Sequence, residues 1–184
     1  MDISVQTTSS GINMARPRRK RQEWEARFAS EYVNKFFPQA TTFLHLRLGV
    51  EPQPARNRDY TESEKRALRV YMRWADAVIV LPTEIKVIEA KLRPAEYPRG
   101  IAQLEIYQKI VPHTPELQPF LPRDFKMRLV VAVHDPVAEV LCREKGFEYH
   151  AWEPPWYRDY LTRLAGRTLR VPRGVAPGTL EEKT

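Results

Sequence analysis

The segment 76–92, with the sequence DAVIVLPTEIKVIEAKL, constrains the fold more than any other part of the chain. Two runs rich in Val and Ile flank Pro82 and Thr83, and β-branched runs on either side of a turn are typical of a β-hairpin. We therefore expect two antiparallel strands here. Their apolar side chains would give a dry and rigid scaffold to any polar group held at the strand ends.

Hydrophobic periodicity predicts further elements on both sides of this hairpin. The expected helices are 22–36, 61–74, 101–111, 136–145 and 155–164, and the further expected strands are 42–50, 127–134 and 147–152. This order of helices and strands predicts an α/β fold in which one central mixed β-sheet is flanked by helices.

The length of 184 residues fits one compact domain with a tail at each end. Residues 1–20 are polar and basic, and we expect them to form a flexible arm. Residues 21–166 would form the domain, and the proline- and glycine-rich residues 167–184 an extended tail.

Composition excludes several classes of protein. No apolar run approaches the roughly 18 residues of a membrane-spanning helix, and the N-terminus lacks the apolar region of a secretory signal, so we expect a cytoplasmic protein without membrane contact. The single cysteine, Cys142, excludes a cysteine-held zinc or iron–sulfur centre. The net charge of +7 is compatible with a polyanionic partner such as nucleic acid, but is too moderate to identify one.

Three charged residues lie where the hairpin would bring them together. Glu89 and Lys91 fall on one face of the second strand, about 6.5–7 Å apart, and Asp76 opens the first strand near the end at which they emerge. Hydrolysis of a phosphodiester needs a divalent metal ion, an activated water and a cation close to the developing charge. Two carboxylates suit Mg²⁺ or Mn²⁺, and a lysine supplies the cation, so these residues fit that chemistry.

An acidic residue followed two positions later by lysine is not specific by itself, because the chain contains four such triplets. They begin at Glu84, Glu89, Asp124 and Glu181. Glu181 lies in the polar tail, Asp124 lies in a proline-rich lead-in, and Glu84 would face the opposite side of the hairpin. Only the triplet at Glu89 ends a β run and has an aspartate at the start of the partner strand.

A glutamine and a tyrosine follow one turn apart on the helix expected next in the chain. Gln103 and Tyr107 share one face of that helix, where they could contact a phosphate, order the lysine or stack on a base. The ordinary alternative is the polar edge of an amphipathic helix. The order Asp76, Glu89-x-Lys91, Gln103-x-x-x-Tyr107 resembles the PD-(D/E)XK nuclease superfamily, and the glutamine–tyrosine helix resembles its RecB-type branch.

The resemblance is confined to the hairpin and the helix after it, and it implies a restriction-endonuclease-like core and a metal-dependent DNA nuclease. In such a site Asp76 and Glu89 would bind Mg²⁺ (or Mn²⁺), with the carbonyl of Ala90 as an extra ligand. Lys91 would lie near the attacking water.

DNA is then the expected partner. A homo-oligomer, or a larger nucleic-acid-processing or virion assembly, is a further expectation. The residue before the aspartate is Ala75, where the motif has proline.

A glutamate on the first helix is a further candidate, because the superfamily often adds one from this position. On a helical wheel with about 100° per residue, Glu25 falls inside an aromatic stripe formed by Trp24, Phe28, Tyr32 and Phe36. A carboxylate on a buried face needs a partner. A metal ion would supply one, and a salt bridge to an arginine or a solvated edge of the stripe are the alternatives.

Two hypotheses besides a nuclease stay open at this stage. A fold does not fix a function, and some viral head-completion and neck proteins are built on nuclease-like folds. A non-catalytic structural or adaptor protein, located in the virion, is therefore the main alternative. A simple DNA-binding module is the weaker one, since the sequence contains no helix-turn-helix, zinc-finger or RNA-recognition pattern.

Overall fold

The computed structural model describes residues 17–50, 61 and 72–168. The rest of the predicted arm and tail, and the greater part of the helix expected over 61–74, lie outside the described residues. None of the described helices is long and apolar enough to cross a membrane. The elements in chain order are α1 (Pro17–Phe36), β1 (Thr41–Leu48), β2 (Arg73–Val80), β3 (Glu84–Lys91), η1 (Pro94–Glu96), α3 (Tyr97–Ile110), η2 (Val111–His113), η3 (Pro115–Phe120), β4 (Asp124–Val131), α4 (Pro136–Glu144), β5 (Glu148–Ala151) and α5 (Tyr157–Thr168), where η marks a 3-10 helix.

The five strands form one mixed sheet in the order β1-β2-β3-β4-β5. β1, β2 and β3 pair antiparallel, whereas β3, β4 and β5 pair parallel. The hairpin predicted around Pro82 and Thr83 is confirmed, and the Leu81 N–H donates to the Glu84 carbonyl across its turn at 2.9 Å. Helices α3 and α4 supply the long connections that parallel pairing requires. The structure therefore confirms an α/β fold with a central mixed sheet flanked by helices.

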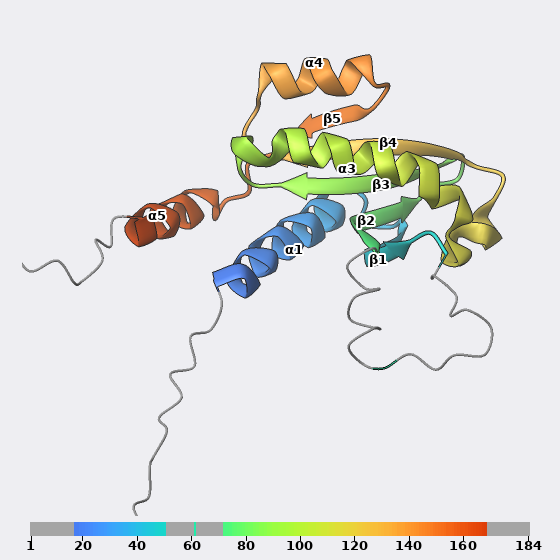
Figure 1. Ribbon diagram of the computed structural model, residues 1–184, viewed down its shortest axis with the longest axis horizontal. Helices are drawn as coiled ribbons and strands as arrows, with labels where there is room; N and C mark the ends of the chain where they lie inside the picture. Colours follow the sequence, from blue (N-terminus) through green and yellow to red (C-terminus); the bar gives the residue numbers. More distant parts are fainter. Residues whose placement is uncertain (1–16, 51–60, 62–71, 169–184) are drawn as a thin grey trace, which may run out of the picture.

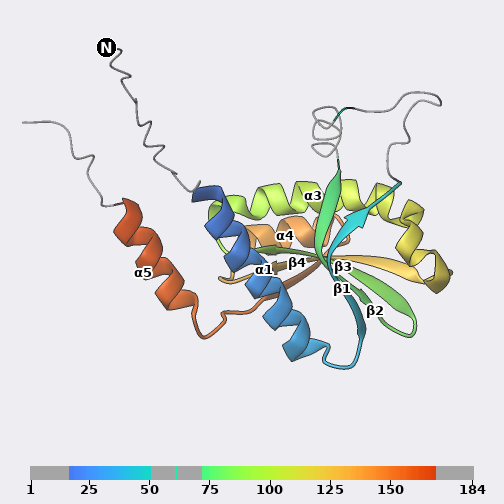
Figure 2. The same ribbon diagram turned by 90° about the horizontal axis from the view of Figure 1, so that it is seen from below.

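Helices cover both faces of the sheet (Figures 1 and 2). Side chains of α3 and α4, among them Ile101 and Leu104, pack with the strands in one apolar core. Side chains of α1 and α5, among them Phe28, Tyr32 and Tyr160, form a second core on the other face. β3 lies between the two cores and is buried over nearly its whole length. A polar side chain at the end of this strand is consequently held in rigid surroundings.

Some element boundaries differ from those expected. α1 begins at Pro17, so the arm predicted over residues 1–20 overlaps the helix. α3 begins at Tyr97 rather than at residue 101, because a proline in the first helical turn removes only an N–H that has no intrahelical partner. Arg73 and Trp74, expected at the end of a helix, open β2 and pair with β1 instead. Strand pairing outweighs the local helical pattern at that point.

The competing triplet at Glu84 faces away from Glu89, as the alternation of the strand predicted. Lys86 donates to both carboxylate oxygens of Glu148, at 2.7 and 3.0 Å, and its ammonium lies 2.6 Å from the carboxylate of Glu84. Arg128 donates to the same Glu148 carboxylate at 2.6 Å. The charges in this cluster balance one another, so the Glu84 triplet has a structural role on the opposite side of the sheet.

Helix α3 approaches the sheet closely at Gly100. A Cβ atom on this residue would lie 2.8 Å from Cδ1 of Leu129 and 3.2 Å from Cγ of Lys91. It would also lie 3.6 Å from Cγ of Glu89. The lack of a side chain at residue 100 therefore lets the helix backbone come within contact distance of the strands that carry the candidate site.

We expect Gly100→Ala to lower the free energy of unfolding by about 1–3 kcal/mol, because the added methyl group overpacks a filled interface. This loss would exceed the roughly 1 kcal/mol that alanine contributes to helix formation. Urea denaturation measures the difference. Gly166→Ala in α5 is the matched control, since a Cβ there meets no atom within 4 Å. Equal stability of Gly100→Ala and the parent would contradict the close approach.

Candidate active site

The register of the hairpin places two carboxylates side by side. Ala77 and Ile88 form the last bridged pair of β2 and β3. The next two positions, Asp76 and Glu89, therefore lie opposite one another and face the same side of the sheet. Lys91 follows two residues after Glu89 and faces the same side, beneath α3. The structure thus brings together the three residues that the sequence singled out.

The Asp76 side chain takes the place of a backbone partner between β2 and β3. A regular continuation of the ladder would pair Ala90 with Ala75. Instead, the Ala90 N–H donates to Oδ2 of Asp76 at 2.8 Å. In an extended strand the N–H and C=O of one residue point to the same edge. The carbonyl of Ala90 therefore faces the edge at which Asp76 lies.

Glu89 is the centre of a buried hydrogen-bond network. Its side chain is 2% exposed. Its Oε1 accepts from the ammonium group of Lys91, and its Oε2 lies 3.0 Å from the hydroxyl oxygen of Tyr107. The Tyr107 hydroxyl is also 2.7 Å from the carbonyl oxygen of Trp74, and it accepts from Nε2 of Gln103 at 3.3 Å. Each oxygen of the Glu89 carboxyl group is thus fixed by a partner from a different direction.

Burial of the Glu89 side chain favours its neutral form. Burial and the neighbouring Asp76 carboxylate raise the pKa of Glu89 to about 8, although the charge of Lys91 and the hydrogen bonds that Lys91 and Tyr107 donate oppose them. The Tyr107 hydroxyl lies within hydrogen-bonding distance of two acceptors, the Trp74 carbonyl at 2.7 Å and Oε2 of Glu89 at 3.0 Å, and can donate its single proton to either.

The same surroundings act on the two other charged residues. Burial raises the pKa of Asp76, against the lowering effect of Lys91 and of the Ala90 N–H. Burial also disfavours the charge on Lys91, but the attraction of Glu89 and Asp76 outweighs it, and the pKa of Lys91 is raised. The site therefore contains two acids that resist ionisation and one lysine that stays charged.

Helix α1 brings a third acid to this end of the sheet. The charge of Glu25 raises the pKa of both Asp76 and Lys91, so its carboxylate lies near enough to act on them. Its side chain is half-buried. The position of Glu25 fits the inward-facing stripe that the helical wheel indicated, while its role as a metal ligand stays a prediction.

Gln103 and Tyr107 lie together, as predicted, but Tyr107 lies too deep in the protein to contact a nucleic acid. Tyr107 is fully buried, so in this arrangement it cannot reach a phosphate or stack on a base. Its hydroxyl group holds Glu89, and Gln103 in turn donates to that hydroxyl. The Oε1 atom of Gln103 is buried and has no hydrogen-bond partner among the described residues. The pair therefore positions Glu89.

The residues at this site provide few ligands for a metal ion, but these ligands are oxygen atoms, which suit Mg²⁺. Within residues 17–50, 61 and 72–168, no group of three or more His, Cys, Asp and Glu side chains could hold an ion. The oxygen donors close together are those of Asp76, Glu89 and Ala90. Mg²⁺ keeps several waters and needs only one or two carboxylates. Glu89 is buried, Asp76 is half-buried, and the pKa of each is raised. A divalent cation would compensate their two negative charges once both have ionised. The donor set therefore fits Mg²⁺ or Mn²⁺.

Two aromatic residues beside the acids were not singled out from the sequence. His45 lies opposite Asp76 in the register of β1 and β2, and its backbone has a φ of 52°. The rings of His45 and Trp74 stack with their centroids 4.7 Å apart and an interplanar angle of 11°. Hydrophobic periodicity contains no signal for a left-handed residue inside a strand. The only available sign was the closeness of Trp74 to Asp76 along the chain.

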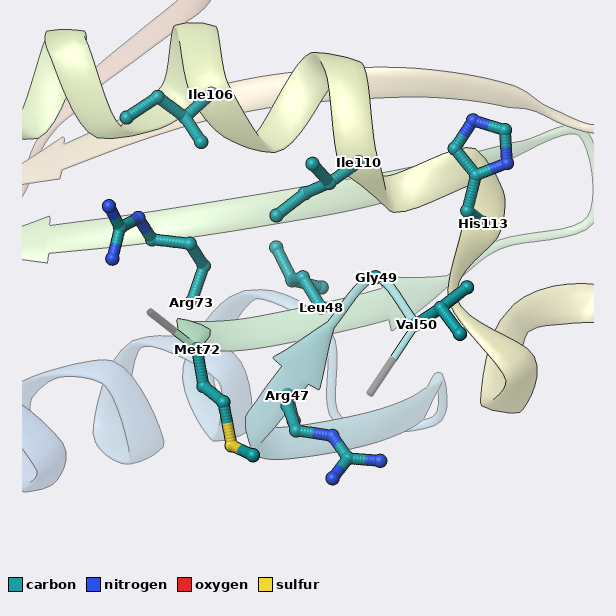
Figure 3. Close-up of a pocket in the computed structure, with 9 residues that line it drawn as sticks. All are labelled: Arg47, Leu48, Gly49, Val50, Met72, Arg73, Ile106, Ile110 and His113. Carbon is teal, nitrogen blue, oxygen red and sulfur yellow. The ribbon is translucent and has the colours of Figure 1, made fainter. Parts of the chain in front are cut away.

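A pocket of about 410 Å³ lies beside this network and includes none of the three acids. Figure 3 shows Arg47 and Arg73 on one side of it and residues of α3, including Ile106, on the other. Arg73 precedes Trp74 and Ile106 precedes Tyr107, so the pocket adjoins the end of the network where those two residues are hydrogen-bonded. Two of the side chains that line it, those of Arg47 and Arg73, are basic.

We predict that the metal-free protein loses stability as the pH rises from about 5 to 9. Glu89 ionises near 4.5 when unfolded and near 8 when folded. The folded state therefore binds more protons over this interval, and the free energy of unfolding falls. Glu89→Gln removes this effect, because an amide can accept from Lys91 and donate to Tyr107. At pH 9 the variant should exceed the parent in stability by something on the order of 1–3 kcal/mol.

Urea denaturation in EDTA at several pH values measures this dependence. Glu116→Gln is the control, since it makes the same chemical change at an exposed position of η3. Its stability should follow that of the parent at each pH. An equal pH dependence in Glu89→Gln and the parent would show that Glu89 is already ionised in the fold.

No family model matches the chain, and no curated protein matches it. Similar solved structures include a repair endonuclease from Pyrococcus abyssi, with a TM-score of 0.38 and 16% identity over 72% of this chain and 47% of that one. They also include the Vibrio cholerae protein VC1899, with a TM-score of 0.37 and 13% identity over 85% of this chain and 36% of that one. The alignments thus span less than half of either neighbour. Likenesses this distant carry no argument about activity, which rests on the residues of the chain itself.

Proposed function

We propose that this protein is a metal-dependent nuclease that hydrolyses phosphodiester bonds of DNA at the site formed by Asp76, Glu89 and Lys91. The observation that supports it most is the placement of two acids opposite one another at the end of a buried hairpin. Buried acids without full compensation reduce stability. A structural protein gains nothing from that cost, whereas a site for a divalent cation requires it.

The ligands of the ion would be the carboxylates of Asp76 and Glu89 and the carbonyl of Ala90, with Glu25 contributing from α1. A bound Mg²⁺ would neutralise charge on the scissile phosphate and lower the pKa of a bound water. Glu89 has to lose its proton for this role, and its pKa of about 8 allows that near neutral pH when a cation competes with the proton.

Lys91 would act on the reacting groups. Its side chain is 7% exposed, and its ammonium group contacts Glu89. The raised pKa keeps it protonated at neutral pH. It would orient the attacking water and stabilise charge on the phosphate in the transition state. Tyr107 and Gln103 act as positioning residues, because they hold the Glu89 carboxyl group through the tyrosine hydroxyl.

We expect the parent protein to cleave linear or circular DNA in Mg²⁺ or Mn²⁺ and to be inactive in EDTA. Lys91→Ala and Asp76→Asn should each lower the cleavage rate by about a hundredfold or more, because each removes charge stabilisation at the reacting phosphate. Gel electrophoresis of both substrates, with endpoints after a time course, measures the rates.

Lys126→Ala is the matched control. Lys126 belongs to another acidic-x-Lys triplet of the chain but is exposed on β4, so its removal should leave the cleavage rate unchanged. Failure of the parent to cut either substrate with any divalent ion would contradict the proposal. That result would favour the non-catalytic structural or adaptor protein.

A further inference from the structure

The stacked rings of His45 and Trp74 are exposed at the edge of the candidate site. Trp74 is 40% exposed and His45 is exposed as well. Neither ring belongs to either of the two apolar cores formed by the described residues. Stacking covers one face of each ring, so the accessible surface of the pair includes their outer faces and edges. Aromatic side chains contribute most to folding when they are buried, and these two contribute little in that way.

The sheet fixes the position of this aromatic pair relative to the two acids. His45 falls between Leu44 and Leu46, which pair with Ala77 and Ala75, so it lies across from Asp76 in the β1–β2 register. The backbone carbonyl of Trp74 accepts from the Tyr107 hydroxyl, which also contacts Glu89. The aromatic pair and the two acids are therefore held by the same strands and by one shared hydrogen-bond network.

The backbone at His45 indicates that the stack is maintained at some cost to stability. A φ of 52° lies in the left-handed region, which is unfavourable for a residue other than glycine. This conformation interrupts the alternation of β1, since Phe43 and Leu46 both pack against the core beneath α3. Strained residues of this kind occur mainly at functional sites.

The surroundings of the stack suit a nucleic acid strand. Arg47 and Arg73 neighbour Trp74 in the paired strands and line the adjoining pocket (Figure 3). Their charges favour the passage of a phosphate backbone along this edge. Exposed aromatic rings beside basic side chains are the combination that binds unpaired bases, because every base has a face on which a ring can stack.

We propose that His45 and Trp74 form a nucleobase-binding subsite, and that the substrate is DNA with unpaired nucleotides next to the bond that is cut. This inference rests on the proposed nuclease function and deepens it. A base inside a duplex is already stacked on both faces, so it cannot use the platform. A base from a single strand can stack there and place the neighbouring phosphate at Asp76 and Glu89.

The test is a binding measurement with Ca²⁺ in place of Mg²⁺ to limit cleavage. Fluorescence anisotropy gives the Kd for a labelled single-stranded oligonucleotide and for the same sequence as a duplex. Trp74→Ala should weaken single-strand binding by about five- to a hundredfold, the range observed for loss of one base–aromatic stack. Duplex binding should stay unchanged, and Trp74→Phe should restore most of the single-strand affinity.

A 2-aminopurine base in the oligonucleotide reports stacking directly. Its fluorescence should be quenched by the parent and by Trp74→Phe, but not by Trp74→Ala. Leu44→Ala is the matched control, because it removes an exposed apolar side chain from the position before His45 on the same strand and should bind like the parent. Circular dichroism and the urea midpoint establish that each variant is folded.

The outcomes separate this inference from the proposed function. Parent protein that cuts DNA in Mg²⁺ while Trp74→Ala binds single strands as tightly as the parent would overturn the subsite and leave the nuclease intact. Equal losses for single strand and duplex would also overturn it. Parent protein that cuts no DNA, but shows Trp74-dependent quenching and single-strand preference, would overturn the nuclease and support the subsite.

Discussion

The pairing of β2 with β3 is the constraint on which the rest of this structure depends. It sets Asp76 opposite Glu89 on a strand that is covered on both faces, where water compensates their charges poorly. The hydrogen bonds around the two acids offset part of this cost. Asp76 accepts the Ala90 N–H in place of a backbone partner, and Lys91 and Tyr107 donate to the two oxygens of Glu89. A domain selected for stability alone would be more stable with apolar residues at the two acidic positions.

Helix α3 links Glu89 to a residue that is exposed at the surface of the molecule. Gly100 allows the helix to lie against the strands, and Tyr107, two turns later, reaches both Glu89 and the backbone of Trp74. The acid and the exposed aromatic ring therefore share one rigid support. In the function that we propose, the groups that hold the strand and the groups that cut it would keep their relative positions without any additional element.

Much of this architecture follows from local sequence patterns, and the remainder depends on contacts between distant segments. Runs of Val and Ile on either side of a turn were sufficient to predict the hairpin, and alternation then placed Glu89 and Lys91 on one face. The hydrogen bond from Tyr107 to Trp74 was not predictable, because the direction of a helical side chain depends on how its helix packs on the sheet. Neither was the left-handed backbone of His45, which lies between two bridged pairs of β1 and β2 and has no local sequence signal.

In the function that we propose, the paired acids at the end of the hairpin hold a divalent cation. Anomalous diffraction from crystals grown with Mn²⁺ tests it most directly, because the signal locates the ion without reference to activity. We predict one anomalous peak within coordinating distance of both Asp76 and Glu89, with the Lys91–Glu89 contact rearranged, and no peak there in Asp76→Asn. An ordered Asp76–Glu89 pair without a peak, at a Mn²⁺ concentration that saturates other sites, would contradict it.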